Sequence, residues 1–298
     1  MKQVFLNRRG EIRLGWLLLA AAVLYTLAAV GVSELYWYLY RTMMGIWCIT
    51  SENISRAPGA VQFLYSWSNV IVQLIQSAFL IGCSWLLARM ARLENEKKPV
   101  ASIRKGIAAG AGGVTLIWLV LMITGCVRQG WRLSRPDFSV NTLAILLTTF
   151  SSAFSEGCFV FGALYGMMKK RLPVWAALGG LAVIHVLMNG SMQPVMIING
   201  LLTALVCCLL REEAGLGAAV GFRFAWGYFD RGIFGFAGAA GALYETYPVN
   251  LYWLSGGNKG ILNGILTTFI LAMLAYWLLY RSGMISRLIL KKKSKSPS

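Results

Sequence analysis

Residues 141–189 read NTLAILLTTFSSAFSEGCFVFGALYGMMKKRLPVWAALGGLAVIHVLMN. The stretch holds two apolar segments separated by the short basic turn Lys169–Pro173, and each segment is long enough for a membrane helix. The first segment carries Glu156, and the second carries His185, the only histidine of the chain. Both lie about 20 Å from the turn at the helical rise per residue. We therefore expect an acid and an imidazole at one depth on antiparallel neighbours, where ionisable groups usually mark a functional site.

The composition of the whole chain is typical of a polytopic membrane protein. Of its 298 residues, 57% are hydrophobic and only 13% are charged, which excludes an ordinary soluble domain. The N-terminus shows no cleavable signal pattern, because its first apolar run is too long and lacks a small-residue cleavage site. The net charge of +17 does not predict a nucleic-acid partner, since the basic residues cluster beside the apolar segments.

Eight apolar segments predict eight transmembrane helices. With the N-terminus in the cytoplasm, 20 of the 28 lysines and arginines fall in inside segments and seven in outside segments, as the positive-inside rule requires. The aromatic residues after residue 33 are expected to form an outer loop at the membrane interface. The predicted segments are residues 14–33, 68–88, 106–126, 141–168, 174–190, 194–210, 216–236 and 261–280.

The fold class predicted from these features is an all-α, polytopic membrane helix bundle with about eight transmembrane helices and both termini in the cytoplasm. We expect three regions: residues 1–139 with three spans, residues 140–280 with five, and a basic cytoplasmic tail, residues 281–298. Membrane lipids are expected partners, and the tail is expected to be attracted to anionic lipid. The predicted location is a bacterial plasma membrane, as a multi-pass protein.

The sequence predicts no metal site and no cofactor. It contains no CxxC and no HExxH motif, and its six cysteines lie mostly inside apolar segments, where they are expected as small core residues. One histidine would leave a zinc site dependent on carboxylate or thiolate ligands at spacings that are not present.

A third ionisable residue, Arg223, is expected at a similar depth. It lies ten residues past Glu213, or about 15 Å into its apolar segment, and Asn189 shares a helix face with His185. Each residue also has a structural explanation: Glu156 as an ion-pair partner, His185 as a core histidine, Arg223 as a side chain that snorkels to the surface, and Asn189 as a helix end. Their coincidence in depth favours a site.

A carboxylate and an imidazole that face one cavity can carry out hydrolysis. Together they can hold a water and accept its proton as the water attacks a carbonyl. Such a reaction needs a further group that stabilises the oxyanion. The sequence therefore predicts Glu156 and His185 as candidate catalytic residues, and Arg223 and Asn189 as candidate oxyanion or charge partners.

Four short motifs follow one another in this half of the chain. Glu156–Gly162 matches E-E-x-x-x-R-G in part, and Leu181–His185, followed by Asn189, matches F-x-x-x-H in part. Gly215–Gly227 matches G-S-L-W-A-A-I-G-x-H-x-A-W-N in part, and Gly256–Gly260 matches G-G-x-x-G. In this order, over roughly residues 140–280, the chain resembles the CPBP family, membrane-embedded glutamic proteases related to the type II CAAX prenyl endopeptidase and to bacteriocin-immunity proteins.

The resemblance implies that Glu156 is the water-activating base and that His185 is the first catalytic histidine. It also brings out departures from the family pattern. Gly157 replaces the second Glu and Phe161 the motif Arg, while Arg223 replaces the second His and Gly227 the following Asn. In the family, that His and Asn are thought to support the oxyanion.

Two functions follow from these departures. Arg223 either supplies the lost hydrogen-bond donors, giving an active intramembrane endopeptidase, or pairs with Glu156 and leaves a weakly active or inactive protein. We favour the second, because Gly157 and Gly227 remove polar groups without replacing them. The expected partner is a membrane-embedded or prenylated peptide, or another membrane protein. A proton-coupled transporter that uses Glu156 as a relay is a third, less favoured alternative.

Overall fold

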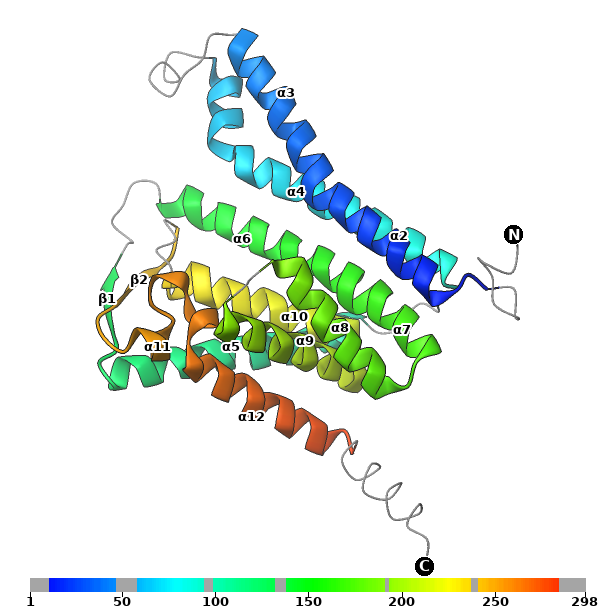
Figure 1. Ribbon diagram of the computed structural model, residues 1–298. Coiled ribbons are helices and arrows are strands. Elements are labelled where there is room, and N and C mark those ends of the chain that lie inside the picture. The colour runs from blue at the N-terminus through cyan, green and yellow to red at the C-terminus, as the bar shows by residue number, and fades with distance from the viewer. Residues whose placement is uncertain are drawn as a thin grey trace, which may run out of the picture.

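The computed structural model describes residues 11–46, 58–93, 99–131, 138–190, 193–236 and 241–283, which form a helix bundle with one small sheet (Figure 1). Five helices are long and apolar enough to cross a membrane: Leu14–Ile46, Gly59–Met90, Ser102–Ile123, Val140–Arg171 and Pro194–Ala214. Val174–Asn189 and Ile265–Arg281 are shorter apolar helices. At this level the prediction of a mostly helical bundle is confirmed, and its long apolar helices are consistent with a membrane protein.

The first helix is longer than its apolar segment. The helix α2 (Leu14–Thr26), the π-helical segment η1 (Leu27–Val32) and α3 (Ser33–Ile46) run on without a break, so the expected outer loop after residue 33 is helical as far as Ile46. Hydropathy falls at Ser33, but no proline follows to stop the helix. The second helix, α4 (Gly59–Met90), likewise begins directly after Pro58, earlier than predicted.

Helix α5 (Pro99–Ile123) packs along α10 (Leu216–Tyr228) with the two backbones in direct contact. A Cβ atom added at Gly106 would lie 1.9 Å from the Ala218 carbonyl oxygen, and one at Gly221 would lie 2.4 Å from the Ile103 carbonyl oxygen. Small residues allow this approach, as in other membrane helix pairs. This interface joins a helix of the predicted region 1–139 to a helix of the predicted region 140–280. The boundary between these two regions stays a prediction.

Four successive helices position the candidate site. The first is continuous through α6 (Phe138–Glu156), the π-helical segment η3 (Gly157–Leu164) and α7 (Tyr165–Arg171). Pro173 precedes α8 (Val174–Asn189), which ends at Gly190 with a positive φ of 64°, a common helix stop. Next come α9 (Pro194–Ala214) and α10, which continues into the π-helical segment η4 (Phe229–Ile233).

A two-stranded antiparallel sheet, absent from the all-α prediction, pairs β1 (Val127–Trp131) with β2 (Tyr244–Pro248). Strands of five residues with distant partners leave little signal in the sequence, which is why this sheet was missed. After β2 come three short helices, α11 (Tyr252–Ser255), η6 (Gly257–Lys259) and η7 (Ile261–Asn263). The final described helix, α12 (Ile265–Arg281), packs against α9.

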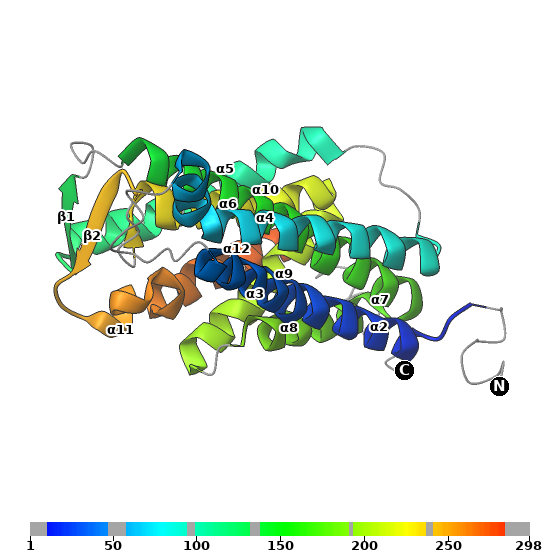
Figure 2. The same ribbon diagram turned by 90° about the horizontal axis from the view of Figure 1, so that it is seen from above.

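Ion pairs connect several helix ends at one end of the bundle, which we call the basic end. Lys169 pairs with Glu212 at 2.7 Å, Lys170 with Glu11 at 3.4 Å, and Arg281 with Glu213 at 3.2 Å. The β1–β2 sheet lies at the opposite end of the bundle (Figures 1 and 2). Of the other predicted inside bases, those at residues 2–9, 97–98 and 287–295 lie outside the described residues, as does most of the predicted tail, residues 284–298.

Candidate functional site

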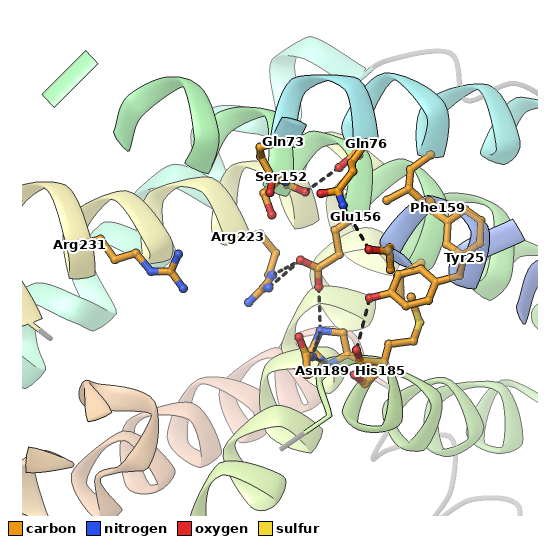
Figure 3. A pocket seen from close by; sticks show the side chains of 16 residues that line it. Tyr25, Gln73, Gln76, Ser152, Glu156, Phe159, His185, Asn189, Arg223 and Arg231 are labelled. Atoms are coloured by element: carbon orange, nitrogen blue, oxygen red, sulfur yellow. Dashed lines mark hydrogen bonds and ion pairs between the residues drawn. The ribbon is translucent and has the colours of Figure 1, made fainter. Parts of the chain in front are cut away.

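The carboxylate of Glu156, at the end of α6, lies between side chains of two other helices (Figure 3). Its Oε1 atom is 2.8 Å from Nε2 of His185 on α8. Its Oε2 atom accepts two hydrogen bonds from Arg223 on α10, at 2.6 Å from Nη2 and 3.2 Å from Nε. The acid, imidazole and guanidinium therefore converge as the sequence predicts, and their roles in catalysis stay predictions.

The imidazole of His185 is held in one orientation. An ionised carboxylate only accepts hydrogen bonds, so His185 donates to Glu156 from Nε2. Asn189, one turn further along α8, donates from Nδ2 to the His185 carbonyl oxygen at 2.8 Å, and the same Nδ2 lies 3.4 Å from Nδ1 and 3.3 Å from Nε2 of the ring. The ring of the fully buried Phe161 lies 5.9 Å from the imidazole. Asn189 thus belongs to the cluster.

Two of the residues that depart from the CPBP motifs, Gly157 and Gly227, have close neighbours that leave little room for a larger side chain. A Cβ atom at Gly157 would lie 2.3 Å from Cγ2 of Val220 on α10, so a glutamate does not fit there unless the Val220 side chain or its helix shifts. A Cβ atom at Gly227 would lie 3.0 Å from Cγ2 of Thr149, which is tight for an asparagine. Apolar contacts therefore occupy the places where the family pattern has polar side chains.

Two cavities meet at the cluster, and both are lined by Ser152, Glu156, His185, Asn189 and Arg223. The first cavity, of about 310 Å³, extends towards η1, α4 and η3. Gln73 and Arg231 also line both cavities, and the first is further lined by Tyr25, Gln76, Phe159 and Met188. The second cavity, of about 320 Å³, extends towards α9 and η4, and its other lining residues include Thr149, Thr203, Trp226, Gly227 and Asp230. The Glu156 carboxylate can therefore be reached from two sides.

An apolar cleft of about 440 Å³ adjoins the first cavity. It lies between α2 and α8, where its walls include Leu18, Ala21 and Leu187. It shares Tyr25, Phe159 and Met188 with the first cavity. A chain of apolar contacts thus leads from between two membrane helices to the polar cluster.

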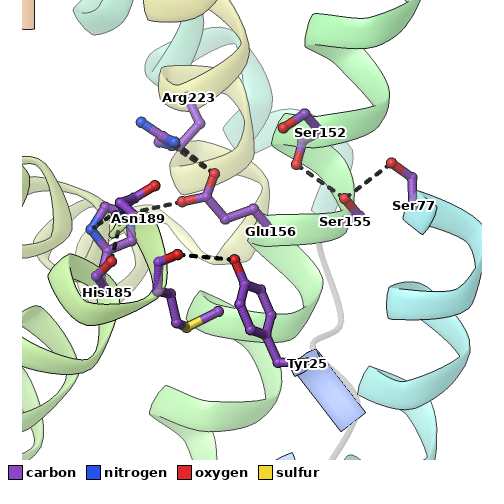
Figure 4. A network of polar contacts seen from close by, with 9 residues as sticks. Tyr25, Ser77, Ser152, Ser155, Glu156, His185, Asn189 and Arg223 are labelled. Atoms are coloured by element: carbon purple, nitrogen blue, oxygen red, sulfur yellow. Dashed lines mark hydrogen bonds and ion pairs between the residues drawn. The ribbon is translucent and has the colours of Figure 1, made fainter. Parts of the chain in front are cut away.

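Several polar residues of the site were missed by the sequence reasoning. The Tyr25 hydroxyl donates to the Met188 carbonyl oxygen at 3.3 Å, and Ser155 Oγ lies 3.3 Å from Ser77 Oγ (Figure 4). Gln76 donates from Nε2 to the Ala29 carbonyl oxygen at 3.3 Å. The available signal was the presence of polar residues inside apolar segments, such as the glutamines of α4 and Asp230 in the seventh predicted span.

Three π-helical segments border the two cavities. The segment η1 contributes Ala28 and Ala29, η3 begins directly after Glu156 and contributes Phe159, and η4 contributes Asp230. A π-helical turn interrupts the regular hydrogen-bond ladder and rotates the following side chains, and such turns concentrate at functional sites. This local winding points to the same region as the ionisable cluster does.

Comparisons with known proteins add nothing to this geometry. No family model, no curated protein and no solved structure matches the chain. Within the described residues, no group of three or more His, Cys, Asp and Glu side chains is arranged to hold a metal ion.

Proposed function

We propose that this chain is a multi-pass membrane protein of the CPBP type in which peptide hydrolysis is weak or absent and which acts by holding a membrane-embedded peptide segment or partner. The observation that carries the proposal is the double hydrogen bond from Arg223 to Oε2 of Glu156. It pairs the family's water-activating acid with a permanent positive charge. Eight transmembrane helices and cytoplasmic termini belong to the same proposal.

The ion pair argues against efficient water activation. In hydrolysis, Glu156 would take a proton from water while the water oxygen bonds to the carbonyl carbon, and the proton would then pass to the departing nitrogen as the C–N bond breaks. Here one carboxylate oxygen already contacts His185 and the other accepts two bonds from Arg223. Little of the carboxylate is left to orient a water, and no second histidine and asparagine support the oxyanion.

The surroundings of the cluster favour a ligand that is partly apolar. The first cavity is polar around Gln73, Gln76 and Ser152, whereas the adjoining cleft between α2 and α8 is apolar. A membrane peptide with an apolar side chain or a lipid chain would place the apolar part in the cleft and a peptide group near Glu156. Most small-molecule sites have this combination of apolar walls and a few convergent polar groups.

An active intramembrane endopeptidase is the second candidate. The guanidinium of Arg223 lines both cavities, so a substrate carbonyl beside Glu156 would meet a charged donor. In this case Arg223 would stabilise the oxyanion in place of the family's second histidine. The two candidates use the same residues and differ only in whether Arg223 disables the acid or assists it.

Cleavage assays in liposomes separate the two candidates. Wild type and Glu156→Gln are compared on a panel of prenylated and membrane-spanning peptides, and we expect no cleavage that depends on Glu156. The triple variant Arg223→His, Gly227→Asn, Thr149→Ser restores the family pair and removes the methyl group that crowds residue 227. It is expected to gain Glu156-dependent cleavage, with Thr149→Ser alone as the control. Cleavage by wild type that is lost in Glu156→Gln would establish the endopeptidase instead.

A further inference from the structure

The second cavity contains buried polar atoms that find no partner within the protein. They are Oδ1 of Asp230, Oγ1 of Thr203 and Nε1 of Trp226. All three residues line this one cavity, and they are only 9%, 2% and 2% exposed, respectively. Buried polar atoms are rarely left unsatisfied, and three of the ten such atoms in the described residues belong to side chains that line this one space, which points to an occupant.

The chemistry of the three atoms defines that occupant. Asp230 needs a donor, the Trp226 indole N–H needs an acceptor, and the Thr203 hydroxyl can use either. A bare cation would satisfy Asp230 but not Trp226, and an anion would do the reverse. Water supplies both roles, and a cavity of about 320 Å³ has far more room than a single molecule requires.

The lining residues also show from which end of the bundle the second cavity is reached. Helix α10 starts at Leu216, near the basic end, and Asp230 lies seven residues beyond Arg223, about two turns towards the opposite end. Asn189 lies at the far end of α8, and Met196 lies at the start of α9. The cavity therefore extends from Glu156 towards the end that carries the β1–β2 sheet.

We infer that the second cavity is a water-filled chamber that connects the Glu156–Arg223 pair to the aqueous phase on the side of the β1–β2 sheet, opposite the basic end. Asp230, Thr203 and Trp226 bind its innermost waters. Water and an apolar ligand then approach the cluster by separate routes, the ligand from the cleft between α2 and α8. The use of this water in hydrolysis rests on the function proposed for Glu156, whereas its presence does not.

Sided cysteine labelling tests the inference without any assay of activity. In a background with the native cysteines replaced by alanine, Thr203→Cys reports on the chamber, and Ile198→Cys on the same helix, at a 47% exposed site on the outer surface of the bundle, is the matched control. Lys259→Cys and Lys105→Cys mark the two ends. With a membrane-impermeant methanethiosulfonate, Thr203→Cys should react at least tenfold faster than Ile198→Cys, and only from the side that labels Lys259→Cys.

Hydroxyl-radical footprinting provides a second measurement on the wild-type chain, which removes the dependence on a cysteine-free background. Trp226 should be oxidised several-fold faster than Phe222, after correction for intrinsic reactivity, because both are buried on α10 but only Trp226 lines the chamber. Equal protection of the two rings overturns the inference. So does labelling of Thr203→Cys no faster than the control, or labelling from the Lys105 side.

Discussion

Arg223 and Glu156 form an ion pair inside an apolar bundle, where each charge depends on the other. Their side chains are 20% and 19% exposed, so water compensates either charge only in part. Removing one partner of a buried pair leaves an uncompensated charge and costs about 3–5 kcal/mol, whereas replacing both by neutral groups of similar size is often tolerated. The pair is therefore a structural bond as well as the feature that limits catalysis in the function proposed above.

A double-mutant cycle measures this dependence. Glu156→Gln and Arg223→Met should each lower the stability of the purified protein in detergent, by a few kcal/mol as expected for a broken buried pair. The double variant should be less destabilised than either single variant. The readout is thermal unfolding, and additive losses would contradict the contact.

The exposed pair Lys169–Glu212 at the basic end is the control for this cycle. Its 2.7 Å separation is close to the 2.6 Å of the buried pair, but the lysine side chain is 45% exposed, with Glu212 at 15%. Surface ion pairs contribute about 0–1 kcal/mol, so Lys169→Met should change the unfolding temperature little. If Lys169→Met lowered the unfolding temperature as much as Arg223→Met does, the assay would not distinguish a buried ion pair from an exposed one.

At this scale the sequence predicted which ionisable groups meet, but not the cavities around them. The depths of Glu156, His185 and Arg223 follow from counting residues along helices. Whether Thr203 or Trp226 faces the same space depends on how each helix is rotated about its axis, which counting does not reveal. The π-helical segments add to this rotation and leave no pattern in the sequence.

Among the helices, α5 and α10 form the contact on which the position of Arg223 depends. The backbone of α5 lies against α10 at Gly106 and Gly110, so a side chain at either position would push α10 away. On the same helix, Gly112 has open space around its Cα atom. Gly106 and Gly112 lie six residues apart on one helix, yet only Gly112 has room for a side chain.

The same substitution at these two sites is expected to have opposite consequences. Gly106→Ala should destabilise the protein by about 1–3 kcal/mol, because overpacking forces the backbones apart. Gly112→Ala should be neutral or slightly stabilising, since alanine favours the helix. Unfolding in a denaturing detergent measures both, and equal effects would argue against the close α5–α10 contact.

The helix ends were less predictable than the helix centres. Gly110 and Gly113, inside the third predicted span, face α10. The helical extension through α3 was missed because hydropathy marks where a segment leaves apolar surroundings, not where its hydrogen-bond ladder stops. Stops set by Pro173 and Gly190 lie close to the predicted ends.

For the whole molecule, the ion pairs at the basic end show which helix ends lie together, and therefore how the helices alternate in direction. Glu11 lies before α2, Lys170 near the end of α7, and Arg281 at the end of α12, and all belong to that end. With this end in the cytoplasm, the described part of the chain follows the positive-inside rule. The fold class was predictable from composition, whereas the long-range pairing of β1 with β2 was not.

Reporter fusions in a bacterial host test the orientation. A fluorescent protein fused after Ser298 should fluoresce, because the C-terminus is expected in the cytoplasm. Alkaline phosphatase inserted after Asn258 should be active, because that reporter needs the opposite compartment, while the same insertion after Leu93 should be inactive. The reverse pattern would invert the proposed topology, and activity at both insertion sites would refute the predicted alternation.

The β1–β2 sheet has a mechanical consequence. Its hydrogen bonds join Trp131 to Tyr244, so everything between them, including the helices that carry Glu156, His185 and Arg223, forms a loop closed at its base. A force applied to the two chain ends would first extract α2, α4, α5 and α12 from the bilayer and would not reach this loop until the strands separate. In a single-molecule pulling record, the helices with the ionisable cluster should therefore leave the membrane last, as one late event.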